Sequence, residues 1–314
     1  MTSYALRRLA LMVPVAFLVT VAVFLIIHLT PGDPALVMLG EERSPEAIRA
    51  IHQQLGLDQP IYVQYWIWLS HVLQGDLGRS ITTHQKVLSL ILQDLPASLE
   101  LGTIALLWSL VVAIPLGTVA ALRRGSFLDY LATGLAVGGV SVPNFFIGVV
   151  LIFAFAVTLR IFPFGGYVPL TRDPLESLRH VLMPALALGT AGAAINMRFT
   201  RSSMIEVLNH DYIRTARAKG AGWLRVVFGH ALKNALIPVV TIVGLQVGGI
   251  LEGAVVTETV FTWPGVGRLA VESIFDRDYQ VVQAIVLMAA LSYMLANLLV
   301  DLAYAWLDPR ISYR

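Results

Sequence analysis

The sequence predicts an all-α integral membrane protein of six transmembrane helices, organised as a single domain over residues 1–314. Of these residues 57% are hydrophobic and only 13% are charged, whereas soluble domains carry about 25% charged residues. The apolar residues gather in long stretches, and the Lys and Arg residues gather in the connections on one side. A net charge of +2 gives no reason to expect nucleic acid as a partner. The absence of cysteine excludes disulfides, thiolate metal sites and cysteine nucleophiles.

A helix needs about 20 mostly apolar residues to cross the hydrocarbon core of a bilayer. Five stretches have this length, and a shorter sixth is rich in Ala and Gly, which suits close packing between helices. The first stretch is longer than a signal-peptide core, so we expect it to be retained. Pro115, Pro143 and Pro184 lie within spans, where neighbouring groups can satisfy the freed backbone. The predicted spans are approximately 9–29, 99–122, 131–159, 181–197, 236–256 and 281–307.

The charges orient these spans. With the N-terminus in the cytoplasm, the cytoplasmic segments hold 13 Lys and Arg residues, and the opposite side holds 9 over longer loops. Because Lys and Arg in short loops mark the cytoplasmic side, we expect both termini there. The large outer loop, 30–98, contains an amphipathic segment at 62–73 with two Trp residues. Two interpretations of that segment are open: a helix at the membrane interface, or an ordinary packed loop helix.

Sequence motifs for common enzymatic reactions are missing. The lysines are Lys86, Lys219 and Lys233, and none lies in a Gly-x-x-x-x-Gly-Lys-Ser/Thr phosphate loop. Neither His-Glu-x-x-His nor Gly-x-Ser-x-Gly occurs. Residues 265–270 match the dinucleotide fingerprint Gly-x-Gly-x-x-Gly/Ala, but no βαβ pattern surrounds them, so the match is accidental. We therefore expect no catalytic residue, no metal ligand and no cofactor on this chain.

The inner loop, 198–235, is the most charged stretch of the chain. We predict a short helix at 212–219. Asp211 would begin it, because its carboxylate can accept from the free N–H groups of the first turn, and Gly220 would end it as a left-handed cap. Small residues in this helix allow another protein to approach closely, and its cations can pair with acidic groups. On spacing alone, an amphipathic helix on anionic lipid explains the pattern equally well.

The stretch 211–238 resembles the signature of binding-protein-dependent ABC import permeases, in which Glu-Ala-Ala-x-x-x-Gly marks the helix that docks on the ATPase subunit. Ala216 and Gly220 match this signature, whereas Arg214 and Thr215 replace the Glu and the first Ala. The usual downstream proline is also absent. This variant is similar to the dipeptide, oligopeptide, nickel and glutathione branch of the family. The residues that the resemblance assigns to ATPase coupling are Asp211, Arg214, Thr215, Ala216, Arg217, Ala218, Lys219 and Gly220.

The resemblance covers essentially the whole chain. Further similar segments are 31–34, 75–78, 200–204, 257–258 together with 263–265, 297–301 and 308–310. It implies a six-helix type I ABC import permease in the inner membrane of a bacterium, forming half of a pathway for peptides or a similar small solute. The implied partners are a second homologous permease, two ATPase subunits that hold ATP and Mg²⁺, and an extracytoplasmic substrate-binding protein. An ion-coupled secondary transporter is the alternative function.

Polar residues within the spans mark candidate pathway positions, because burying polar groups in hydrocarbon is costly. A structural hydrogen bond between helices is the alternative explanation for each of them. The candidates are Asn144, Asn196, Gln246, Glu252 and Asn297, with Asp301 as a further charged group. The outer segment 258–267 is rich in Gly, Pro and aromatic residues, so it could form either an extracytoplasmic gate or a rigid plug. Its candidate gate residues are Glu258, Trp263, Pro264 and Gly265.

Overall fold

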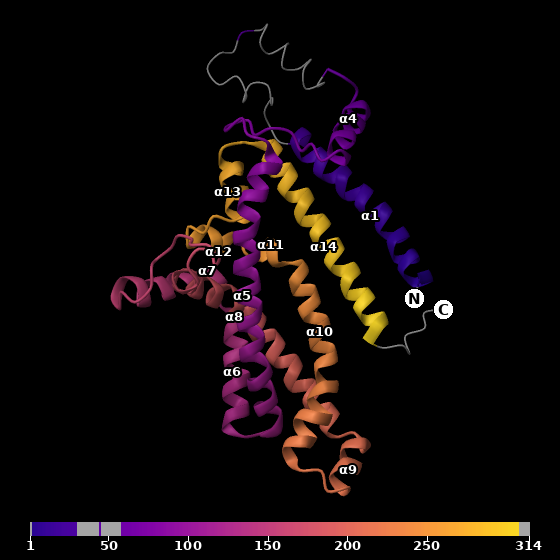
Figure 1. The fold of residues 1–314 in the computed structure, drawn as a ribbon, viewed down its shortest axis with the longest axis vertical. Coiled ribbons are helices and arrows are strands. Elements are labelled where there is room, and N and C mark those ends of the chain that lie inside the picture. The colour runs from indigo at the N-terminus through magenta and orange to yellow at the C-terminus, as the bar shows by residue number, and fades with distance from the viewer. Residues whose placement is uncertain (1, 30–43, 45–57, 308–314) are drawn as a thin grey trace.

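The computed structural model describes residues 2–29, 44 and 58–307, so the segments 31–34 and 308–310 lie outside the described residues. Throughout the described part, the regular elements are helices without strands (Figure 1). Five helices are long and apolar enough to cross a membrane, and a bent pair is a sixth candidate. These are α1 (Thr2–Leu29), α5 (Val87–Leu122), α8 (Pro174–Leu208), the π-helix η2 (Arg225–Ala231) continued by α10 (Leu232–Gly248), and α14 (Tyr279–Leu307).

The predicted third span, 131–159, is not one continuous helix. It forms α6 (Phe127–Ser141), followed by α7 (Asn144–Leu151) and the π-helix η1 (Ile152–Thr158), and the two parts meet at 102°. Val142 between them is extended, with φ −88° and ψ 124°. Pro143 explains the break, because it disfavours helical geometry at the preceding residue and has no N–H for the helical ladder. Figure 1 shows α7 lying across the direction of α5 and α6.

The predicted fifth span, 236–256, ends earlier than expected. Helix α10 stops at Gly248, and two short helices follow, α11 (Ile250–Gly253) and α12 (Val255–Val260). Consecutive glycines at 248 and 249 lower the helix propensity at this point. The chain then turns and forms α13 (Val266–Phe275) before entering α14.

Helices α5 and α8 form the centre of the bundle. The predicted fourth span, 181–197, is the middle part of α8, which has 35 residues. At Gly117 an added Cβ would lie 2.7 Å from the carbonyl oxygen of Met197, and at Gly189 it would lie 2.6 Å from that of Ala105. The two backbones therefore approach as closely as glycine allows, the contact for which small residues are used between membrane helices.

Helix α4 (Ile61–Leu73), which covers the predicted amphipathic segment, packs against α1. Tyr65 is buried there, its hydroxyl lies 2.8 Å from Thr20 Oγ1, and its ring makes an edge contact with Phe24. Trp66 on the same helix stays 60% exposed. Helix α4 is therefore packed on one side and leaves an apolar, aromatic face exposed on the other. Figure 1 shows α4 towards one end of the molecule and α9 (Asp211–Ala218) at the other.

Candidate functional site

Helix α9 lies in a hairpin that follows α8 and leads into the π-helix η2 (Arg225–Ala231). Ile213 is fully buried in a cluster with Met204 and Val227, which come from α8 and η2. The opposite side of α9 is exposed. The exposed residues of the predicted coupling set are Asp211, Arg214, Thr215, Arg217, Ala218, Lys219 and Gly220, and Ala216 is half-buried. The hairpin thus presents a cationic surface on an apolar anchor.

The two ends of α9 differ in how well the sequence predicted them. Gly220 has φ +80°, so the predicted left-handed cap is present. The amide of Ala221 donates to Ala216 O at 3.2 Å and that of Gly220 donates to Arg217 O at 3.0 Å, which is the Schellman pattern. The predicted Asp211 cap is wrong, because the helix begins one residue earlier, with His210 at the capping position and no side-chain cap.

A cavity of about 310 Å³ lies among α5, α7, α8, α10 and α11. Of the predicted pathway residues, Asn144 and Gln246 line it, together with Ser109 as a third polar group. Among the residues that the structure describes, the rest of the lining is apolar or glycine, and none of these residues carries a charge. The glycines are Gly102, Gly189, Gly192, Gly249 and Gly253.

Asn196 is fully buried beside this cavity and joins three helices. Its Nδ2 donates to Ser109 Oγ at 2.9 Å and to Gln246 Oε1 at 3.0 Å, while Gln246 Nε2 donates back to Asn196 Oδ1 at 3.3 Å. These bonds fix α5, α8 and α10 relative to one another, and they fit the structural explanation for Asn196 and Gln246. The Asn144 side chain, by contrast, makes no hydrogen bond with any residue that the structure describes, and it is half-buried.

Two further polar candidates lie away from the central cavity. Asn297 and Asp301 line a separate cavity of about 210 Å³ between α1 and α14, where Asp301 forms an ion pair of 2.9 Å with Arg8. Glu252 lies in α11, but its side chain is outside what the structure describes. The predicted set therefore separates into a group at the central cavity and a pair at the α1–α14 contact.

The predicted gate residues form a buried cluster against α5. Glu258 is fully buried, and it accepts from Ser98 Oγ at 2.6 Å and from the Arg268 amide at 3.0 Å. Trp263 is also fully buried, with its indole N–H donating to Ala97 O at 2.9 Å. Gly265 is buried and Pro264 is half-buried. Such a pinned segment has the geometry of a rigid plug.

Burial raises the pKa of the Glu258 carboxyl, and hydrogen bonds from Ser98 and from the amides of Arg268 and Gly267 oppose that shift in part. The Gly265 position has no room for a side chain, because an added Cβ would overlap the Glu258 carboxylate. The lack of space at Gly265 shows how tightly the segment closes over this acid.

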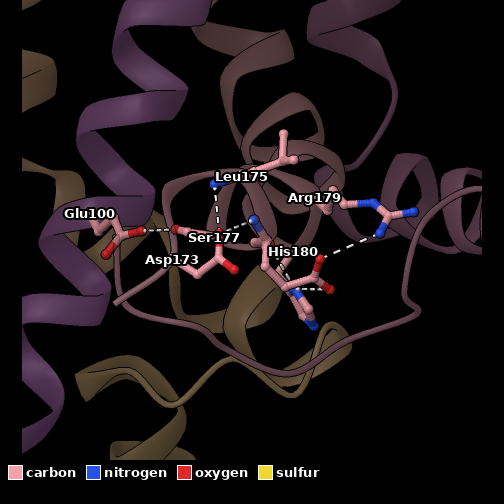
Figure 2. A network of polar contacts seen from close by, with 7 residues as sticks. Glu100, Asp173, Leu175, Ser177, Arg179 and His180 are labelled. Atoms are coloured by element: carbon pink, nitrogen blue, oxygen red, sulfur yellow. Dashed lines mark hydrogen bonds and ion pairs between the residues drawn. The ribbon is translucent and has the colours of Figure 1, made fainter. Parts of the chain in front are cut away.

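Sequence reasoning missed a second polar cluster, at the start of α8 (Figure 2). Glu100 on α5 accepts from Ser177 Oγ at 2.8 Å and from the Tyr167 hydroxyl at 3.0 Å. Burial and this hydrogen bond raise the pKa of Tyr167 to about 12. Asp173 caps α8 by accepting from the amides of Leu175 and Glu176, both at 3.1 Å. An acidic residue before a proline and a glutamate is a helix-start signal that could have located this cap.

A third cluster, also missed, joins α6 to α8. Asp129 is buried, and its carboxylate accepts two hydrogen bonds from the Arg201 guanidinium. Of these, the bond from Arg201 Nη2 to Asp129 Oδ2 is 2.8 Å long. The Gly125 amide adds a bond of 2.9 Å to the same carboxylate. The described residues contain no group of three or more His, Cys, Asp or Glu that could hold a metal ion.

Several apolar helices long enough to cross a membrane define a multi-pass membrane protein, with a cavity inside the bundle and an exposed cationic hairpin at one end. A family model for the binding-protein-dependent transport system inner membrane component matches residues 113–313, and the model for its N-terminal part matches residues 1–102. The chain belongs to this family.

Curated relatives match the chain along its whole length. The dipeptide transport system permease protein DppB of Alkalihalophilus pseudofirmus is 44% identical, and the alignment covers 100% of both chains. The glutathione transport system permease protein GsiC is 43% identical in Escherichia coli and 44% identical in Salmonella typhimurium, again over 100% of both chains. The resemblance stated from the motifs is therefore confirmed for the family and for its dipeptide and glutathione branch.

Proposed function

We propose that this chain, the permease subunit of an ATP-driven ABC importer, forms half of a translocation pathway for short peptides or glutathione-like peptides. The observation that carries this proposal is the 43–44% identity over full length to permeases named for dipeptides and for glutathione. The central cavity supports it, because its neutral amide and hydroxyl groups suit a peptide better than a metal ion.

The partners are proposed from the same family. A second, homologous permease would complete the pathway, two ATPase subunits would bind ATP and Mg²⁺, and an extracytoplasmic binding protein would deliver the solute. Helix α9 supports an ATPase contact, because Arg214, Arg217 and Lys219 are exposed on a helix that Ile213 anchors from behind. In this arrangement the chain neither binds nor hydrolyses ATP itself.

The proposed location is the inner membrane of a bacterium, with α9 and both termini on the cytoplasmic side. The distribution of Lys and Arg in the short connections supports this orientation. An ion-coupled secondary transporter is not favoured, because the matching family is that of binding-protein-dependent transport systems and the full-length relatives are named as permease proteins of transport systems.

Reconstitution of the four kinds of subunit in proteoliposomes tests the proposal. Peptide accumulation should require ATP, the loaded binding protein and the ATPase subunits together. The same chain purified alone should show no ATP turnover. Uptake that follows an ion gradient without ATP would contradict the proposal, and so would ATP turnover by the isolated chain free of contaminants.

A further inference from the structure

The central cavity contains two kinds of amide side chain. Gln246 is held by reciprocal hydrogen bonds with Asn196, at 3.0 and 3.3 Å, and Asn196 is held in turn by Ser109 at 2.9 Å. The side-chain amides of Gln246 and Asn196 are therefore already engaged in hydrogen bonds that fix α5, α8 and α10 relative to one another. Asn144 lines the same cavity without a hydrogen-bond partner among the described residues, so its full donor and acceptor capacity is available.

The local fold explains why Asn144 remains available. It is the first residue of α7, directly after Pro143, where the chain turns by 102° from α6. The bend takes α7 away from the direction of α6 while its first residue lines the cavity. Nearby, Gly192 leaves room beside the fixed amide, because a Cβ there would contact Ser109 Oγ at 3.4 Å and Gln246 Oε1 at 3.7 Å.

An unpaired carboxamide has a definite chemical complement. Its C=O accepts and its NH₂ donates, so it can pair with the N–H and C=O of a peptide group. The lining residues that the structure describes carry no charge, so they provide no ion pair that would favour acidic or basic side chains. A site of this kind can bind the backbone N–H and C=O groups that all peptides share, and it does not discriminate between peptides by the charge of their side chains.

We propose that Asn144 is the residue of this cavity that contacts the transported solute, and that it recognises neutral peptide groups without selecting for side-chain charge. Gln246 and Asn196 then serve as positioning residues that hold the cavity open between α5, α8 and α10. This assignment rests on the proposed function, because it requires a peptide to pass through the chain.

A charge introduced at position 144 tests the assignment. Maximal uptake rates are measured in proteoliposomes for neutral, acidic and basic tripeptides, each at saturating loaded binding protein, so that delivery is equal. The wild type should carry all three at comparable maximal rates. Asn144→Asp should lower the rate for the acidic peptide roughly tenfold relative to the neutral one, because like charges repel in a partly dry cavity. Asn144→Gln, which keeps a neutral carboxamide, should carry all three peptides at comparable maximal rates, as the wild type does.

Ser141→Asp is the matched control, since Ser141 lies three residues earlier, is exposed and does not line the cavity. It should leave the ratio of acidic to neutral rates unchanged. An unchanged ratio in Asn144→Asp would overturn the assignment, and so would strong charge selection by the wild type under equal delivery. Failure of the wild-type complex to carry any peptide would instead overturn the proposed function, and the assignment with it.

A labelling experiment keeps the assignment testable if Asn144→Asp does not assemble. The chain has no natural cysteine, so Asn144→Cys and Ser141→Cys each provide a single thiol. In the assembled complex, transported tripeptide should slow modification at position 144 severalfold and leave position 141 unaffected. Equal modification rates at position 144 with and without peptide would overturn the assignment.

Discussion

Ser98 Oγ donates to Glu258 Oε1 across 2.6 Å, joining α5 to α12 between residues 160 positions apart. The same Ser98 oxygen accepts from the Val266 amide at 2.9 Å, and the second carboxylate oxygen of Glu258 accepts from the Arg268 amide at 3.0 Å. Two side chains therefore satisfy the free N–H groups at the start of α13, as a local cap would do. This geometry favours a plug that moves together with α5 over a loop that opens independently of it.

Gly265→Ala should destabilise this plug. An added Cβ would overlap the Glu258 carboxylate, and overpacking of this kind costs about 1–3 kcal/mol. Thermal unfolding in detergent, followed by tryptophan fluorescence, should show a lower midpoint. Gly138→Ala on α6 is the control, because its Cβ would meet nothing within 4 Å. Equal midpoints for the two variants would refute the close packing at residue 265.

The Asp129–Arg201 pair should behave as a coupled unit. Removing one partner of a buried pair costs about 3–5 kcal/mol when the remaining charge is fully buried, and Arg201 keeps 27% exposure, so we expect a smaller cost. Asp129→Ala should therefore destabilise the protein by less than this range, and Asp129→Ala combined with Arg201→Met should recover part of the loss. Stabilities measured for both single variants and the double variant give the coupling energy. Strictly additive effects would mean that the pair contributes nothing.

Gly220→Val should impair assembly with the ATPase and uptake, while leaving membrane insertion intact. At φ +80° a β-branched residue is strained by about 1–3 kcal/mol. Space is not the cause, because a Cβ at residue 220 would meet nothing within 4 Å. Gly222→Val is a matched control: its Cβ is equally free and its φ lies outside the left-handed region.

Co-purification of the ATPase with each variant separates two explanations of α9. An ATPase-docking helix predicts a defect for Gly220→Val that Gly222→Val does not share. Arg217→Glu and Lys219→Glu should weaken the same contact, in a manner that depends on salt concentration. A helix that only rests on lipid predicts charge-reversal effects that are the same with and without the ATPase.

The orientation in the membrane can be tested with single cysteines, since the chain has none of its own. Thr171 and Asn209 are both exposed and lie at the two ends of α8. An impermeant thiol reagent applied to intact cells should modify Thr171→Cys and not Asn209→Cys. Disrupted cells provide the control, because both positions should then react. Modification of position 209 from outside intact cells would show that the predicted orientation is wrong.

The fold was predictable from sequence wherever it depends on the composition of one segment. Whether a helix is stable in the hydrocarbon core depends on the mean hydropathy of about 20 consecutive residues. The hydropathy of the sequence therefore located the long helices. Gly220 was predictable for a similar reason, since positive φ is a local property that glycine tolerates. The capping residue of α9 was placed one position too far along the chain, because competing helix starts differ little in energy.

The sequence by itself determined that the chain is a membrane-embedded helical bundle, that it belongs to a family of import permeases, and that a glycine ends its exposed cationic helix. Only the tertiary structure decided which polar residues meet. Asn196 and Gln246 are 50 residues apart, and Ser98 and Glu258 are 160 apart. Their pairing depends on how each helix is rotated and how closely glycines let the backbones approach. The Asn144 side chain has no hydrogen-bond partner among the described residues, and this could be found only from the packing of the neighbouring helices.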